Sequence, residues 1–208
     1  MLCLKVPTDA AWAAAAVQDV DAVLADHAHC EMKAASNALS LVARHPGDPE
    51  LARTLTDLAR EEIEHFQRVL GMLVERGVVL GPPPVDVYAA ELRRAAHELP
   101  KDSRAGGALL DRLLVGALIE ARSCERFKLL ADAASSRPDR TAEGALWTEL
   151  LAEEARHYRT FVDLATRAAG GDRERVAARL DALATAESAI VTRLARTTGA
   201  SERATIHG

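Results

Sequence analysis

The chain has 208 residues, a formal net charge of -5 at pH 7 and only 3% aromatic residues. A chain of this length is more often one well-packed domain than two small ones, so we expect a single domain over 1–208. The acidic balance argues against a uniformly basic nucleic-acid-binding module. Alanine, leucine, arginine and glutamate are abundant, and this composition favours helices over β-sheet, so it predicts the all-α class.

The cysteines and the N-terminus indicate the compartment. Cys3, Cys30 and Cys124 form no CxxC motif and leave an odd number, which favours free thiols in a reducing compartment over disulfides. The N-terminus lacks a basic region followed by an apolar segment, and no run approaches the ~18 apolar residues of a membrane span. We therefore expect a cytoplasmic protein with no membrane partner.

The first half of the chain is expected to form a hairpin of two long helices. The first helix should cover about 17–44, where the sequence HPGDP at 45–49 ends it. The second should begin at Asp48, a natural N-cap that is followed by Pro49 at the first helical position. Gly77 is placed to end this helix in a left-handed conformation.

The second half repeats this plan after a connection. The segment GVVLGPPPVD over 77–86 should be non-helical, and a short helix should follow over about 86–98. Long helices are expected over 105–134 and about 139–169, with the turn SSRPDR between them. A last amphipathic helix should cover about 172–196.

Two such hairpins predict a four-helix bundle. Its core should span about 17–169, with a crossover connection between the two halves and with the short helix and the C-terminal helix as additions. The segments HCEMKA and EEIEH of the first half look like copies of SCERFK and EEARH of the second. We interpret this similarity as a weak internal repeat of one hairpin.

Each long helix has a glutamate in the middle of its apolar stripe. In the second helix the stripe steps by three and four residues through Leu51, Leu55, Leu58, Glu62, His65, Val69 and Met72. The fourth helix repeats the pattern with Trp147, Leu150, Glu154, His157, Phe161 and Leu164. The stripes of the first and third helices are centred on Glu31 and Glu120. Glutamate and histidine at matching depth in a core need an explanation.

Bound metal ions explain these side chains. Burying one unpaired carboxylate costs several kcal/mol, and four would exceed the ~5 to 15 kcal/mol stability of a typical domain. Two divalent ions would balance four carboxylates and accept two neutral imidazoles, whereas protonation or arginine pairing leaves the histidines unexplained. Oxygen-rich ligation suits Fe or Mn better than structural zinc. The predicted ligands are Glu31, Glu62, His65, Glu120, Glu154 and His157.

The neighbouring acids leave alternatives at some of these positions. Glu61 and Glu153 precede the two histidines by four residues, but the stripes favour Glu62 and Glu154. The spacings agree, because Glu31 precedes Glu62 by 31 residues and Glu120 precedes Glu154 by 34, about the length needed to run along one helix and back to the same depth.

The third-helix ligand and the role of a nearby histidine stay open. The internal repeat aligns SCE with HCE and so matches Glu125 to Glu31, which makes Glu125 an alternative to Glu120. Helix length and a turn centred near Arg137 favour Glu120. His27, one turn before Glu31, is either a partner that orients Glu31 or an ordinary packed histidine.

Several segments resemble a known enzyme family. LADHAHCEMKAA, LAREEIEHFQRVLGMLVERG, LLVGALIEARSCERFKLLA and LLAEEARHY look like the signature segments of the bacterial tRNA 2-methylthio-N6-isopentenyladenosine hydroxylases, a ferritin-like non-haem di-iron monooxygenase family. The resemblance covers about residues 5–195. It implies that the six predicted ligands hold two irons and that no other residue is clearly catalytic. It also implies hydroxylation of the isopentenyl side chain of a modified adenosine next to the anticodon, with O2 and two external electrons from a reductase or ferredoxin.

The same resemblance implies tRNA as the partner. Arg122 and Arg126 flank the ligand position on the third helix, and we expect them to contact phosphates of the anticodon loop. The sequence has no RNA-recognition motif and no aromatic stacking platform, so the tRNA assignment depends on the resemblance alone.

Two other functions are compatible with a di-iron bundle. One is a ferritin-like or rubrerythrin-like ferroxidase or peroxidase, although the CxxC rubredoxin module of rubrerythrins is absent here. The other is a non-enzymatic helical adaptor whose metal ions only stabilise the fold.

Overall fold

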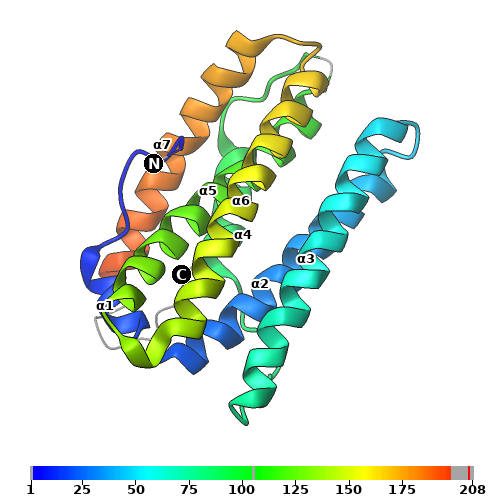
Figure 1. The fold of residues 1–208 in the computed structure, drawn as a ribbon. Coiled ribbons are helices and arrows are strands. Elements are labelled where there is room, and N and C mark those ends of the chain that lie inside the picture. The colour runs from blue at the N-terminus through cyan, green and yellow to red at the C-terminus, as the bar shows by residue number, and fades with distance from the viewer. Residues whose placement is uncertain (1, 105, 198–205, 207–208) are drawn as a thin grey trace. The chain divides into compact units, whose positions relative to one another are not determined.

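Helices make up nearly all the regular structure of this protein, in a computed structural model that describes residues 2–104, 106–197 and 206. No β-strand occurs among the described residues, so the prediction of an all-α class is confirmed. In chain order the elements are α1 (Ala10–Ala16), α2 (Val20–Arg44), α3 (Pro49–Glu75), α4 (Val87–Glu98), α5 (Gly107–Ser135), the 3-10 turn η1 (Pro138–Arg140), α6 (Thr141–Ala168) and α7 (Arg173–Thr197) (Figure 1).

The chain divides into two compact units. The α2–α3 unit consists of Gln18–Val85 together with Ile206, and the α5–α6 unit consists of the described residues of 1–17 and 86–197. Each unit contains one of the two predicted long-helix hairpins. The single domain over 1–208 stays a prediction.

The α2–α3 unit is a helical hairpin with well-defined ends (Figure 1). The Asp48 carboxylate accepts a hydrogen bond from the Leu51 N–H at 3.0 Å, with Pro49 in the first turn, which confirms the predicted start of α3. Gly77 follows α3 with a φ of 70°, the left-handed conformation expected of it. The first long helix begins at Val20, three residues later than predicted, because Asp19 caps it through the Ala22 N–H.

In the α5–α6 unit, α5 packs along α6, while α4 and α7 pack against each other and against α5 (Figure 1). The close approach of α5 to α6 depends on Gly116, where an added Cβ would lie 2.9 Å from the Phe161 ring. Between α6 and α7, Gly170 and Gly171 have φ values of 71° and 87°, so they allow a sharp turn between these two helices. Before the first hairpin, an alanine-rich segment forms the short helix α1.

The apolar stripes predicted from the sequence form the core of each unit. Leu51, Leu55 and Leu58 of α3 are buried, as are Trp147, Leu150 and Phe161 of α6. Phe127 of α5 stacks on Trp147 with ring centroids 5.6 Å apart. None of the helices in the described part of the chain is long and apolar enough to cross a lipid bilayer.

Replacing Asp48 with alanine is expected to lower the free energy of unfolding by about 1 kcal/mol, because the first turn of α3 loses a side-chain acceptor. Urea denaturation followed by circular dichroism measures this change. Arg53→Ala, at an exposed position on the same helix, is the control and should change the stability by less than about 0.5 kcal/mol. Equal losses in the two variants would contradict the capping role.

Candidate metal centre

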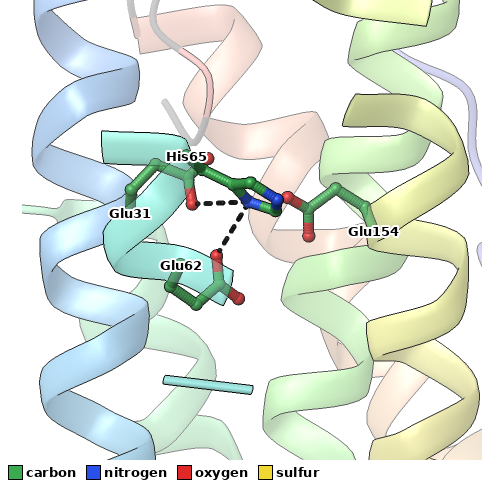
Figure 2. Close-up of side chains that lie close together, drawn as sticks. All are labelled: Glu31, Glu62, His65 and Glu154. Atoms are coloured by element: carbon green, nitrogen blue, oxygen red, sulfur yellow. Dashed lines mark ion pairs between the residues drawn. The ribbon is translucent and has the colours of Figure 1, made fainter. Parts of the chain in front are cut away.

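Three of the predicted ligands meet inside the α2–α3 unit. Glu31 comes from α2, and Glu62 and His65 come from α3; their exposed fractions are 3%, 1% and 3%. One donor atom of each side chain lies within 4.8 Å of the others (Figure 2). We call these residues the α2–α3 triad.

The imidazole of His65 is directed at both carboxylates of this triad (Figure 2). Its Nδ1 lies 3.5 Å from Glu31 Oε2 and 3.4 Å from Glu62 Oε2. The other oxygen of Glu31, Oε1, lies 2.8 Å from His27 Nε2. Glu31 therefore lies between two imidazoles, and His27 is placed to orient it, which is the role that sequence analysis proposed as one of two alternatives.

The α5–α6 unit contains a second set with the same composition. Glu120 of α5 and Glu154 and His157 of α6 are 5%, 2% and 2% exposed, and one donor atom of each lies within 4.8 Å of the others. His157 Nδ1 lies 3.5 Å from Glu154 Oε2. We call these residues the α5–α6 triad. In both triads the first helix supplies one glutamate, and the second supplies a glutamate and, three residues later, a histidine whose Nδ1 faces a carboxylate.

The donor set of each triad fits a divalent metal ion. Two carboxylates carry two negative charges, which one divalent ion balances, and a neutral imidazole completes the set. Two atoms bound to one ion at about 2.1 Å lie about 3.0 to 3.5 Å apart. The observed separations of 3.4 and 3.5 Å agree with this range and are too long for strong hydrogen bonds.

The structure separates the predicted ligands from the alternative acids. Glu61 and Glu153 are partly exposed, whereas Glu62 and Glu154 are buried. Glu125 lies in a different cluster, where its carboxylate accepts hydrogen bonds from Thr8 N at 3.0 Å and Thr8 Oγ1 at 2.7 Å. Among the third-helix candidates, Glu120 is therefore the glutamate that lies beside the α6 ligands.

The two arginines expected at the RNA surface are buried instead. Arg122 is fully buried and binds the Glu187 carboxylate through Nε at 3.0 Å and Nη2 at 2.8 Å. Arg126 is 6% exposed, and its guanidinium lies 5.1 Å from the centroid of the Trp12 ring. Buried guanidiniums with these contacts are not presented to a phosphate, so their burial does not support the RNA contacts expected of Arg122 and Arg126.

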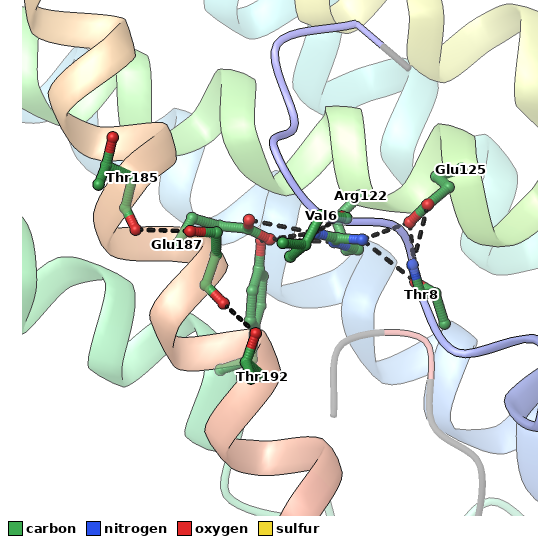
Figure 3. Close-up of polar contacts among 9 residues, drawn as sticks. Val6, Thr8, Arg122, Glu125, Thr185, Glu187 and Thr192 are labelled. Carbon is green, nitrogen blue, oxygen red and sulfur yellow. Dashed lines mark hydrogen bonds and ion pairs between the residues drawn. The ribbon is translucent and has the colours of Figure 1, made fainter.

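Sequence analysis missed the buried polar cluster around Arg122 (Figure 3). Glu187 of α7 is fully buried, and its Oε1 accepts a hydrogen bond from Tyr88 of α4 at 3.1 Å. The same sequence feature that indicated the triads, a glutamate within an apolar helical stripe, is present here. Glu187 interrupts a stripe of buried Leu183, Ala184, Ile190 and Val191. No histidine accompanies Glu187 on that stripe, and its counterion is an arginine from another helix.

Comparison with known proteins places the chain among tRNA-modifying enzymes. The family model described as tRNA-(MS[2]IO[6]A)-hydroxylase (MiaE) matches residues 1–199. A relative from Pseudomonas putida, described as a tRNA 2-(methylsulfanyl)-N(6)-isopentenyladenosine(37) hydroxylase, is 44% identical over 164 residues, which are 78% of this chain and 74% of the relative. A protein of the same description from Salmonella typhimurium is 28% identical and covers 81% of this chain and 77% of its own length.

One solved structure agrees with the fold over the whole chain. It is described as Protein 43 with aldehyde deformylating oxygenase activity from Synechococcus, and it matches with a TM-score of 0.84 at 36% sequence identity. The match covers 100% of this chain and 96% of that chain. This agreement confirms the all-α, ferritin-like fold class predicted from the sequence.

Iodoacetamide at pH 8 is expected to leave Cys124 of the folded protein unmodified. Burial, with a further contribution from the Glu154 carboxylate, raises the pKa of this thiol to about 12. Roughly one thiol in ten thousand is then ionised at pH 8, and only the thiolate reacts. Peptide mass spectrometry measures the modification, and the same reaction in concentrated urea is the control, where all 3 cysteines should react. Rapid labelling of Cys124 in the folded protein would contradict its burial.

Proposed function

The chain belongs to the MiaE family and is a tRNA 2-methylthio-N6-isopentenyladenosine hydroxylase, and we propose that its two triads hold the two irons of the oxygen-activating centre. The observation that carries the proposal is the repetition of one buried donor set, two glutamates and a histidine, in each long-helix hairpin. Together the triads supply four carboxylates and two imidazoles, which is the ligand set of di-iron carboxylate bundles.

Charge and donor chemistry support iron at these positions. Each triad would hold one divalent ion through hard carboxylate oxygens and one imidazole nitrogen, a set that suits Fe or Mn better than structural zinc. Cys124 remains a neutral thiol because burial raises its pKa to about 12, and it is not one of the proposed ligands. His27 would hold Glu31 in orientation from the side opposite to His65.

The chemistry supplied by a bound di-iron centre is insertion of one atom of O2 into a C–H bond of the prenyl side chain, while two external electrons and two protons convert the other atom to water. The protein's own contribution is to hold the ligand side chains and to exclude water from them. Both triads interrupt buried apolar stripes, with Leu58 and Val69 around Glu62 and His65, and Leu150 and Phe161 around Glu154 and His157. These apolar side chains favour a dry site.

The substrate and the electron source follow from the family assignment. We propose that the modified nucleotide next to the anticodon is splayed out of its loop, so that the apolar prenyl tail reaches the metal centre while the rest of the tRNA stays outside. We further propose that a reductase or ferredoxin supplies the two electrons. Family membership favours this hydroxylase function over the ferroxidase, peroxidase and adaptor alternatives.

A second candidate activity deserves a direct assay because of one comparison. The solved structure described as having aldehyde deformylating oxygenase activity is 36% identical to this chain over its whole length. We propose, as the alternative substrate class, a long-chain aldehyde whose apolar tail would enter the same region as the prenyl group. Release of formate from such an aldehyde, in the presence of O2 and a reductant, would support it.

Replacing Glu62 or His157 with alanine is expected to reduce iron loading at the corresponding triad and to leave tRNA hydroxylation undetectable, because each triad loses one of three donors. Iron per chain is measured after anaerobic reconstitution with Fe(II). Hydroxylation is measured by mass spectrometry of nucleosides from the tRNA of a deletion strain that expresses each variant.

The adjacent acids provide matched controls for these variants. Glu61→Ala and Glu153→Ala remove a carboxylate one residue from each ligand position without removing a member of either triad. Both controls should retain iron and hydroxylation. Full activity of Glu62→Ala would exclude the proposed site. Hydroxylated nucleoside in the tRNA of the deletion strain without the gene would exclude the proposed reaction.

The two candidates on α5 make different predictions. Glu120→Gln should weaken metal binding strongly, since Glu120 lies beside Glu154 and His157. Glu125→Gln should lower the melting temperature, because the Glu125 carboxylate bonds Thr8 and Arg122, and it should weaken metal binding much less than Glu120→Gln, because every donor of the triad is kept. Iron content and thermal unfolding of the two variants, measured side by side, test this assignment; the reverse pattern would make Glu125 the ligand.

A further inference from the structure

The N-terminal segment Leu2–Asp9 contacts two helices of the α5–α6 unit, α5 and α7. Val6 O accepts a hydrogen bond from Arg122 Nη2 of α5 at 3.2 Å, and Thr8 Oγ1 accepts one from Arg122 Nη1 at 3.2 Å (Figure 3). On α7, Lys5 Nζ lies 2.7 Å from Asp181 Oδ1. We call Leu2–Asp9 the N-terminal strap.

On α5, the strap contacts a residue that adjoins the α5–α6 triad. Arg122 follows Glu120 by two residues. Residues two apart on a helix point in nearly opposite directions, about 200° around the axis. Glu120 therefore faces the α6 ligands while Arg122, on the other side of α5, faces the strap and α7.

The contacts at Arg122 restrict how α5 can rotate. The guanidinium donates to the carboxylates of Glu125 and Glu187, to the Thr8 hydroxyl and to the Val6 carbonyl. A planar group held by acceptors on several sides has little freedom to turn. Rotation of α5 about its axis would break the hydrogen bonds to Glu187, Thr8 and Val6, which lie outside α5, and would also move Glu120 away from Glu154 and His157.

We propose that the N-terminal strap is a positioning element for the α5–α6 triad, acting on Glu120 through Arg122. The inference rests on the proposed function, since it assumes that the triad binds a metal ion. The hydrogen bonds and ion pairs described here for the strap all lie in the α5–α6 unit, so its effect should be confined to one of the two bound ions. Partners that orient metal ligands typically contribute 10- to 100-fold to metal affinity.

Thr8→Val tests the proposal with a small change of shape. It removes the hydroxyl that donates to Glu125 and accepts from Arg122, and it leaves the Thr8 N–H bond to Glu125 in place. A second variant, Arg122→Lys, keeps the positive charge opposite Glu187 but removes the planar group. In both variants we expect one of the two ions to bind about 10- to 100-fold more weakly while the other is unchanged.

The control removes a strap contact to a helix without proposed ligands. Lys5→Ala loses the contacts with Asp181 and Thr185 of α7, which are at the surface, and should bind both ions as the unaltered chain does. Each full-length protein is titrated anaerobically with Co(II), whose absorption spectrum reports its ligands, and thermal unfolding is recorded for each variant.

The outcomes separate positioning from simple stabilisation. Selective weakening of one ion, with an altered Co(II) spectrum at a temperature well below unfolding, supports the strap as a positioning element. A lower melting temperature with two ions bound normally in both Thr8→Val and Arg122→Lys would overturn this inference and leave the proposed function standing. Failure of the unaltered chain to bind Co(II) or Fe(II) would overturn both.

Discussion

The need to neutralise buried carboxylates determines how this protein is built. Glu31, Glu62, Glu120, Glu154 and Glu187 are all at most 5% exposed, and a buried carboxylate without a counter-charge costs several kcal/mol. Glu187 is neutralised by Arg122, which reaches it from α5. The other four carboxylates are grouped in pairs with a histidine each, an arrangement that one divalent ion per pair would neutralise.

Neutralising a buried carboxylate with an arginine and neutralising it with a metal ion have different consequences for the molecule. An arginine and a carboxylate can satisfy one another, so the cluster around Arg122 joins α4, α5, α7 and the N-terminal strap within one unit. A triad offers two carboxylates and an imidazole at one place and therefore suits a divalent ion with reactive chemistry. Stability and reactivity thus come from the same buried residue type with different counterions.

The contacts of α5 connect these two roles. One side of the helix presents Glu120 to the α6 ligands, and the other presents Arg122 to the strap and α7. A helix held on one side by several polar contacts keeps its other side in register, which matters for ligands that must converge within a few tenths of an ångström. Residues outside the metal centre, such as Arg122, therefore contribute to its function by holding α5 in position.

Local sequence pattern determined the helices, the Asp48 cap and which glutamate of each doublet is buried, because helical periodicity and capping depend on residues a few positions apart. It could not decide between Glu120 and Glu125, and it assigned Arg122 to a surface where the residue does not lie. Thr8 lies 117 residues before Glu125, and Glu187 lies 65 residues after Arg122. Only the tertiary structure brings such distant partners together, because contacts between residues this far apart in the chain depend on how the helices pack, so only it shows that Arg122 is the counterion of Glu187.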